Sequence, residues 1–207
     1  MPPFRDAVAI AAMFIFVVVA QIDQPYPDLA PLQHMPSVTI LVCLLFVQAK
    51  RRFSSMALLS IFTFIALHTV GGRYIYSNVP YDAWVEAIVG LRPGDVFGWQ
   101  RNQYDRLVHL MFGVSAMLPL CEVVRWYWRI LVRDAVLLSI AFVFAVSAIY
   151  EIFEWLLTLV MAGPAAENYN GQQGDIWDAQ RDMALAGIGA FVAAGMILLY
   201  PPRSLRT

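Results

Sequence analysis

Six long apolar stretches dominate this sequence and decide what it can fold into. They lie near residues 5–22, 36–50, 54–74, 105–125, 134–162 and 177–200. About 20 apolar residues in a helix cross the roughly 30 Å hydrocarbon core of a bilayer, and a helix satisfies its backbone hydrogen bonds internally. We therefore predict an all-α, polytopic membrane helix bundle with six transmembrane helices, forming a single domain over residues 1–207.

The composition agrees with a membrane protein. Hydrophobic residues make up 60% of the 207 residues and charged residues 14%, and the mean hydropathy is +0.62. A soluble domain is about a quarter charged. The net charge of −1 gives no information about partners, and too few basic residues cluster together to indicate nucleic-acid binding. The two cysteines, Cys43 and Cys121, fall within apolar stretches and imply no disulfide framework.

Basic residues set the orientation, because cytoplasmic loops of membrane proteins are enriched in lysine and arginine. The second connection is basic at residues 50–52, and the fourth is basic over 125–133. The short first and fifth connections contain acidic residues and neither lysine nor arginine. We therefore predict that both termini are cytoplasmic and that the first, third and fifth connections lie outside.

Two outer connections have their own character. The third, residues 75–104, contains the apolar stretch 84–91, which is too short to cross a membrane and predicts a short interfacial helix. The fifth, residues 163–176, has three glycines and a proline and is expected to be irregular. Both connections are placed to cap a cavity at the outer ends of the helices.

Ionisable residues lie in or beside the apolar stretches, all toward one side of the membrane. The eight residues are His68, Asp105, His109, Glu151, Glu154, Asp175, Asp178 and Asp182. A charged side chain inside a bilayer is costly, so such residues often mark a functional site. Counting about 1.5 Å per helical residue from the expected helix ends puts those within helices in the outer third of the bilayer. This convergence predicts a site that opens to the outer leaflet or the periplasm.

The spacing aligns these residues in pairs. The pairs that share a helix face are Asp105 with His109, Asp178 with Asp182, and Glu151 with Glu154. Carboxylates and imidazoles from several helices hold iron or manganese in di-metal bundles, and the same ligands suit zinc. The charge of these acids has to be settled by a metal, by nearby arginines or by protonation, and the metal we predict is divalent, Zn, Mn or Fe. The expected ligands are His68, His109, Asp105, Asp178 and Asp182, with Glu151 and Glu154 as the expected catalytic residues.

Arginines are expected at the same level as the acids. They are Arg73, Arg106 and Arg181. Guanidinium groups bind carboxylates or phosphates through paired hydrogen bonds. These arginines either neutralise the acids or, together with Asp175, bind an anionic lipid headgroup or a lipid-linked substrate beside the metal. The sequence leaves that choice open.

Simpler structural interpretations stand beside the functional ones. His68 on its own fits a hydrogen-bonded helix histidine, Asp178 fits a helix N-terminal acid favoured by the dipole, and Asp175 fits a loop or capping residue. Glu122 does not belong to the set. It lies near the cytoplasmic end of its stretch, three residues before Arg125, where we expect an interfacial ion pair.

Four motifs resemble the YjdF-type family of bacterial inner-membrane proteins. They are residues 68–74 (HTVGGRY), 101–109 (RNQYDRLVH), 150–155 (YEIFEW) and 173–183 (QGDIWDAQRDM). The similarity runs from the second stretch to the sixth, and a weaker one extends to VanZ-like membrane proteins. It implies a multi-pass protein of the bacterial inner membrane and leaves the reaction open. Gln103 stands where some relatives are expected to carry histidine, which makes it a poor ligand candidate.

Three functions remain compatible with these residues. The leading hypothesis is an enzyme that uses a metal to hydrolyse or transfer a group on a lipid-linked or envelope substrate. The alternative is an ion-coupled transporter, because membrane carboxylates and histidines also form ion paths. Against transport, the ionisable residues stop in the outer third and no repeat with broken helices is evident. The third is a binding or scaffold protein whose polar network only holds helices together. The sequence specifies neither substrate nor oligomeric state.

Overall fold

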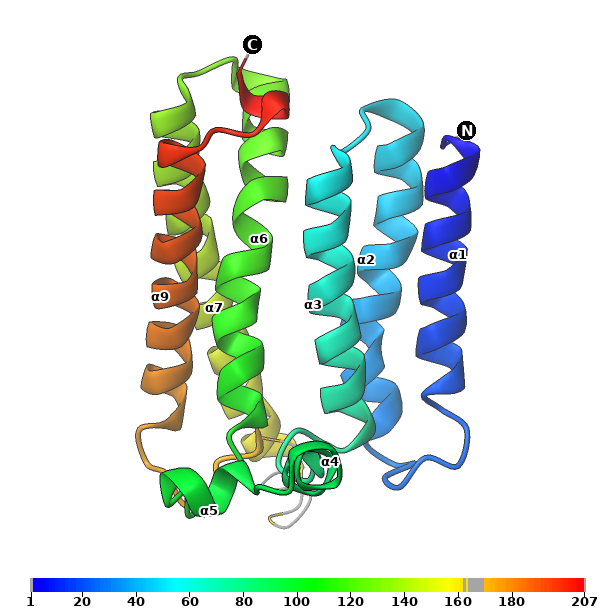
Figure 1. Cartoon of the computed structure of the whole chain (residues 1–207), viewed down its shortest axis with the longest axis vertical. Coiled ribbons are helices and arrows are strands. Elements are labelled where there is room, and N and C mark those ends of the chain that lie inside the picture. Colours follow the sequence, from blue (N-terminus) through cyan, green and yellow to red (C-terminus); the bar gives the residue numbers. More distant parts are fainter. Residues whose placement is uncertain (1, 162, 164–169, 207) are drawn as a thin grey trace.

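The computed structural model describes residues 2–161, 163 and 170–206. Its long helices are α1 (Phe4–Val19), α2 (Ala30–Lys50), α3 (Ser55–Arg73), α6 (Tyr104–Trp128), α7 (Val132–Val160) and α9 (Asp178–Leu199). They stand side by side as a bundle with both termini at one end (Figure 1). The described part of the chain contains helices and no strand, so the all-α prediction is confirmed.

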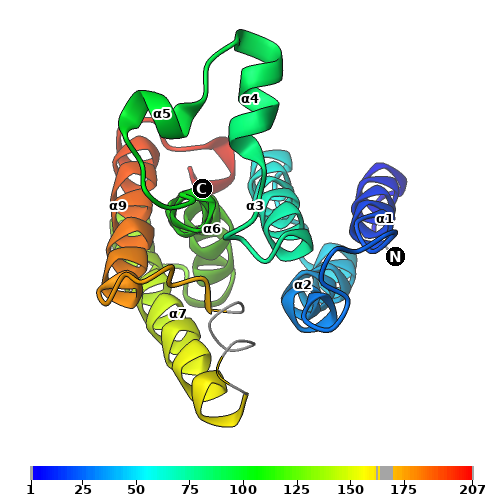
Figure 2. The same cartoon turned by 90° about the horizontal axis from the view of Figure 1, so that it is seen from below.

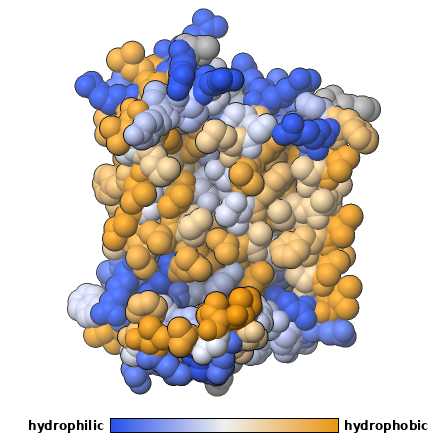
Figure 3. All heavy atoms as spheres, viewed as in Figure 1, coloured by the Kyte–Doolittle hydropathy of each residue, from blue (hydrophilic) through white to orange (hydrophobic). Residues whose placement is uncertain are grey.

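The surface of the bundle is suited to lipid. Among the described residues, five helices are long and apolar enough to cross a membrane, namely α2, α3, α6, α7 and α9. Helix α1 has 16 residues and is shorter than that length. Large apolar side chains such as Ile15, Phe142 and Phe191 are exposed on the outer faces. Figure 3 shows a band of apolar residues between two ends where polar residues gather, which is the pattern of a protein whose solvent at mid-height is the bilayer.

Helix α2 corrects one expected boundary. The sequence analysis placed this span near 36–50. In the structure α2 begins at Ala30 and Pro36 lies inside it. Proline is tolerated in membrane helices where neighbouring groups satisfy the freed backbone. The longer helix brings His34 into the bundle. The other expected spans agree with helices to within a few residues.

The helices form two groups that meet through α3 and α6. Helices α1, α2 and α3 pack together, as do α6, α7 and α9 (Figure 2). Within the second group α6 and α9 are parallel and very close. A methyl group added at Gly113 would overlap the backbone carbonyl of Ala186, and one added at Gly189 would overlap that of Leu110. Small residues permit such close approach between membrane helices, so these two glycines fix how α6 faces α9.

Two short helices lie at the end opposite the termini, to one side of the bundle (Figure 2). Helix α4 (Tyr81–Val89) forms where the interfacial helix was expected, and α5 (Pro93–Phe97) follows it (Figure 1). Gly90 ends α4 in a left-handed conformation, with φ of 72°, which glycine adopts without strain. The 3-10 helix η1 (Arg203–Leu205) lies near the opposite end. Much of the expected irregular connection 163–176, with Glu167, lies outside the described residues.

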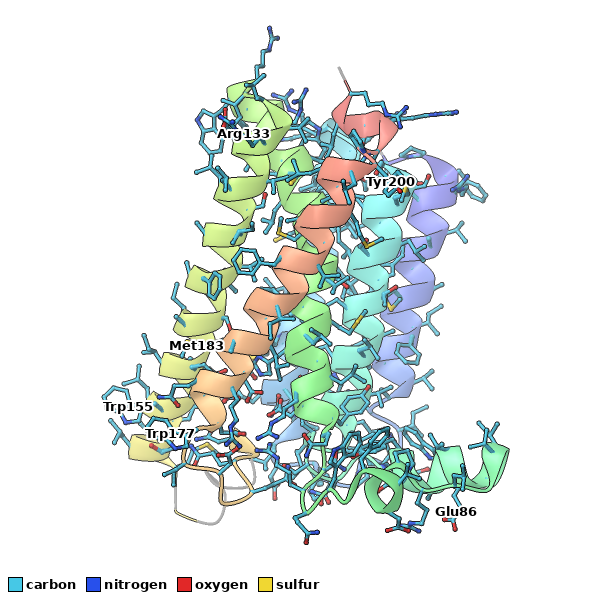
Figure 4. The ribbon with its side chains drawn as sticks, turned by 60° about the vertical axis from the view of Figure 1, so that its left-hand side comes forward. Glu86, Arg133, Trp155, Trp177, Met183 and Tyr200 are labelled. Carbon is cyan, nitrogen blue, oxygen red and sulfur yellow. The ribbon has the colours of Figure 1, made fainter. Side chains whose placement is uncertain are left out.

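Interfacial aromatic residues mark the end of the bundle at which α4 and α5 lie. Figure 4 shows Trp155 of α7 and Trp177, just before α9, at the end where Glu86 lies, and Arg133 at the opposite end. Tryptophan is enriched at membrane–water interfaces. The two ends of the bundle therefore correspond to the two membrane surfaces.

Glu122 lies toward the end of α6 that faces the termini, as expected, and the residue is 2% exposed. The expected ion pair with Arg125 stays a prediction. Oε2 of Glu122 accepts a hydrogen bond of 3.0 Å from the backbone N–H of Ser54, the residue that caps α3. The first backbone donors of a helix have no partner inside the helix. The carboxylate on α6 therefore supports the start of α3, away from the acids at the other end.

Candidate functional site

Helices α6 and α9 bring three potential metal ligands together. Asp105 and His109 lie one turn apart on α6, and Asp182 lies on the second turn of α9. Each offers one ligand atom, and these atoms all lie within 4.8 Å of one another. Asp105 is 9% exposed and Asp182 2% exposed. The helices are parallel, so both N-termini face this region, and their dipoles favour acidic residues there.

Helix α7 adds two glutamates to the same region. Oε1 of Glu151 is 3.8 Å from Nε2 of His109, and the glutamate side chain is 9% exposed. Glu154 lies on the next turn, where its carboxylate accepts a hydrogen bond from the side chain of Tyr150 and interacts electrostatically with Asp105 and Glu151. The i,i+3 spacing puts both glutamates on the face of α7 that points to α6 and α9.

Two carboxylate oxygens in this group have no partner. Within the described residues, Oδ1 of Asp182 and Oε1 of Glu151 are buried and accept no hydrogen bond. Buried polar atoms are almost always hydrogen-bonded, so each exception needs an explanation. Carboxylates this close also repel one another. The cluster of Asp105, His109, Glu151 and Asp182 is therefore suited to a positively charged ligand.

Arginines neutralise a separate pair of acids beside this cluster. Arg101 pairs with Asp178 and lies 3.6 Å from Asp175, while Arg106 and Arg181 both pair with Asp175. Asp178 therefore lies outside the three-ligand group and is held by arginine. This ion-pair network joins the segment before α6 to the start of α9.

Asp175 lies in the connection before α9. Burial on its own raises the pKa of this carboxyl. The opposing effects are larger, because the backbone N–H of Trp177 donates to Oδ1 at 3.1 Å and the guanidinium groups of Arg181 and Arg106 are close. The net pKa of Asp175 is below its ordinary value of 3.8. At neutral pH the carboxylate is therefore ionised and can hold the arginines.

His68 belongs to the wall of an adjoining cavity. Its Nδ1 is 3.2 Å from Oγ of Ser37, and it lines a cavity of about 180 Å³ together with Asp105 and His109. The residue is 6% exposed. The structure thus puts His68 near the cluster and outside the three-ligand group.

Arg73 has a different set of partners from the other arginines. Its guanidinium donates to the backbone carbonyls of Ala20, Ile22 and Asp23 at 2.6, 2.7 and 3.1 Å. These bonds hold the first connection against the end of α3. Arg73 is therefore occupied by backbone, whereas Arg106 and Arg181 lie at the acids.

Two residues near the site were not identified as candidates from the sequence. Arg101 stands out in the sequence only as part of a motif, although its position four residues before Asp105 puts it just before the N-terminus of α6. His34 is 4% exposed, and its ring nitrogens have no hydrogen-bond partner among the described residues. A methyl group at Gly72 would lie 3.1 Å from its ring. The signal for His34 was a histidine two residues before a proline in an apolar stretch.

Comparison with known proteins agrees with this architecture. Residues 6–203 match the family described as "Predicted membrane protein (DUF2238)". The "Inner membrane protein YjdF" of Escherichia coli (strain K12) is 35% identical over 180 residues, which cover 84% of this chain and 80% of that protein. No solved structure matches the chain. This chain is a multi-pass protein of the bacterial inner membrane, and it belongs to the DUF2238 family of predicted membrane proteins.

Proposed function

We propose that this protein is a membrane-embedded, metal-dependent enzyme that hydrolyses or transfers a group on a lipid-linked substrate. The observation that supports this most is the convergence of Asp105, His109 and Asp182, whose ligand atoms lie within 4.8 Å of one another. Catalytic zinc sites use three protein ligands and keep one position open. Ligands that share a metal at about 2.0–2.2 Å stand roughly 3–4 Å apart, so binding requires only a modest contraction of the group.

The negative charge of the buried acids favours binding of a divalent cation. Four acids, Asp105, Asp182, Glu151 and Glu154, crowd one buried region, and His109 is the base among them. The nearby arginines are engaged by Asp175 and Asp178. Like charges close together in a low-dielectric interior repel strongly, and a cation of charge two relieves that repulsion. Zinc, manganese and iron all accept carboxylate and imidazole ligands.

The glutamates of α7 are the proposed proton acceptors. When bound, the metal supplies polarisation of a phosphoryl or acyl oxygen and activation of water. Glu151 lies beside His109 with one carboxylate oxygen unpartnered among the described residues, so it can accept the proton of a water molecule at that point. Glu154 is oriented by the hydrogen bond from Tyr150 and is the second candidate for this role.

Two arginines have donors left for an anionic headgroup. Nε of Arg106 is buried and has no hydrogen-bond partner among the described residues. The side chain of Arg181 is 54% exposed even though it pairs with Asp175. Guanidinium groups bind phosphate through paired hydrogen bonds. We assign Arg106 and Arg181 to the headgroup, with Asp175 as the acid that positions them, and we assign no such role to Arg73.

The proposed topology makes α1 the sixth span and both termini cytoplasmic. Helix α1 lies along α2 with exposed apolar side chains such as Val8 and Ile15, and its 16 residues extend about 24 Å. The end that carries the termini also carries the basic connections at residues 50–52 and 125–133. Reporter fusions after Asp28 and Gly174 should locate outside, and one after Arg129 should locate inside. A cytoplasmic reporter at Gly174 would overturn the proposed outer site.

Metal content is the experiment that tests the enzyme proposal. Protein purified in mild detergent is stripped, reloaded with Zn²⁺, Mn²⁺ or Fe²⁺ and analysed by elemental mass spectrometry. We expect near-stoichiometric metal in the wild type and in Glu151→Gln, and a large loss in Asp182→Asn. The matched control is Asp95→Asn, which removes an acid with 80% side-chain exposure in the outer connection and should keep the metal. A wild type that binds none of the three metals would refute the proposal.

A further inference from the structure

A cavity that is mostly apolar adjoins the three-ligand group. We infer that it binds the hydrocarbon chain of an outer-leaflet lipid, which enters sideways from the bilayer, with the headgroup at Arg106 and Arg181 beside the candidate metal ligands. This inference deepens the proposed function, on which it rests, by naming the apolar part of the substrate.

The lining changes from polar to apolar along the membrane normal. On α6 the lining residues run from Asp105 through His109 to Phe112, and on α3 from His68 to Phe64. In each helix the polar residue lies nearer the end with α4 and α5, and the apolar residue lies deeper. Asp105 and Phe112 are about 10 Å apart along the helix axis. A lipid of the outer leaflet has the same order, with a polar headgroup at the surface and an apolar chain below.

The floor of the cavity is aromatic. The rings of Phe64 and Phe112 are 5.5 Å apart between centroids, and they join α3 and α6 at the place where the two helix groups meet. Ile40 of α2 and Val146 of α7 complete the apolar walls. Ser147, next to Val146, also lines the cavity, and its buried Oγ has no hydrogen-bond partner among the described residues. One hydroxyl among apolar surfaces gives a water cluster few partners, and a cavity needs several before water occupies it.

The inferred route of entry lies between two of the lining helices. Helices α2 and α7 both line the cavity, and in the described part of the chain they share no extensive contact with each other. Figure 2 shows both on the same side of the α3–α6 pair, with α2 next to α3 and α7 next to α6. Pro36 of α2 is exposed, and Val146 of α7 is partly exposed. A chain that enters between these two helices comes from lipid and does not cross water.

The volume fits a segment of one chain. The cavity measures about 180 Å³, and a protein cavity of roughly 150 Å³ holds one benzene molecule. It therefore accepts a stretch of about six carbons of the lipid chain. The rest of the chain lies between α2 and α7 and in the bilayer. Lipid tails are as apolar as the cavity wall, so transfer of the chain brings little hydrophobic gain. Retention then depends on the headgroup, which we place at Arg106 and Arg181, so it does not require the metal.

Photo-crosslinking in vesicles tests the inference. The full chain is reconstituted in phosphatidylethanolamine–phosphatidylglycerol vesicles with increasing fractions of a chain-labelled diazirine probe, either phosphatidylglycerol or polyprenyl phosphate. Adducts are mapped by peptide mass spectrometry. We expect adducts at Phe64 or Phe112 that saturate at low probe fraction, whereas adducts at lipid-facing Phe142 rise in proportion to the probe. Saturation with only one probe identifies that chain type as the occupant.

Matched variants of α7 separate the cavity from the lipid surface. Val146→Phe fills the cavity and should abolish the saturable adducts, while Ile149→Phe adds the same group on a side chain that is 65% exposed and should leave them unchanged. Ile40→Phe on α2 repeats the test from the other wall if Val146→Phe inserts poorly. Adducts at Phe64 and Phe112 that are absent, unsaturable or unaffected by both cavity variants would overturn the inference. Metal content of the same samples keeps the two proposals separate, because saturable adducts in a wild type without metal refute the metal enzyme alone.

Discussion

Nε2 of His109 on α6 lies 3.8 Å from Oε1 of Glu151 on α7, and the same nitrogen is 3.6 Å from Oδ1 of Asp105. One buried imidazole thus stands between carboxylates of two helices, and Asp182 of a third helix completes the group. Buried charges are retained where they are paired or bind a metal. Both the helix packing and the proposed chemistry depend on this contact. Substitutions can therefore test, one at a time, the interactions that hold these side chains in place.

The close contact of α6 with α9 gives the first prediction. Gly189→Ala should destabilise the protein by about 1–3 kcal/mol and reduce metal binding, because the added methyl group meets the carbonyl of Leu110 and displaces α9. Gly195→Ala on the same helix meets nothing within 4 Å and should be neutral or slightly stabilising. Reversible unfolding in mixed micelles measures both. Equal effects of the two substitutions would contradict the packing account.

The ion pairs of the outer end give the second prediction. Arg101→Gln should cost on the order of 3 kcal/mol, because it removes the arginine closest to the buried carboxylate of Asp178 and leaves that carboxylate only Arg106, at 3.9 Å. Arg92→Gln removes an exposed arginine that pairs with Glu86 and should cost at most about 1 kcal/mol. The measurement is the same unfolding free energy. If both variants behave like the wild type, the network at Asp175 and Asp178 does not stabilise the start of α9.

The carboxyl of Asp175 gives a prediction for pH. Its pKa in the folded protein is below the ordinary value of 3.8, so its ionised form stabilises the folded state. That contribution is fully present above pH 3.8 and is lost as the pH falls through the folded-state pKa. Melting temperatures of the wild type and Asp175→Asn should therefore differ at pH 6 and converge below pH 3.8. A difference that grows on acidification would have the wrong sign.

The lengths of the apolar stretches predicted most of the helices. Helical spacing predicted which ionisable residues of one helix share a face. The long helices lie where stretches such as 105–125 and 177–200 were expected, because the thickness of the bilayer sets the length of a spanning helix. The pairing of Asp105 with His109 follows from the helical repeat. Both features depend only on interactions within one helix and on the thickness of the bilayer, so they can be predicted from the sequence.

The contacts between helices could not be predicted from the sequence. Periodicity tells which residues share a face of a helix but gives no rotation of that helix relative to its neighbours. Here the rotation is set by the close approach at Gly113 and Gly189, and it selects Asp182 for the ligand group while Asp178 turns to Arg101. The start of α2 was placed too late for a related reason, since neighbouring groups in the bundle allow Pro36 inside the helix.

Coordination by His109 is the central claim, and pulsed EPR of Mn²⁺-loaded protein tests it directly. The protein is produced with nitrogen-15 in its histidines, and the spectrum reports imidazole nitrogen bonded to the manganese. We predict coupling to one directly bound imidazole in the wild type and in His68→Gln, and its loss in His109→Gln. Manganese without nitrogen coupling in the wild type, or coupling that persists in His109→Gln and disappears in His68→Gln, would contradict the account.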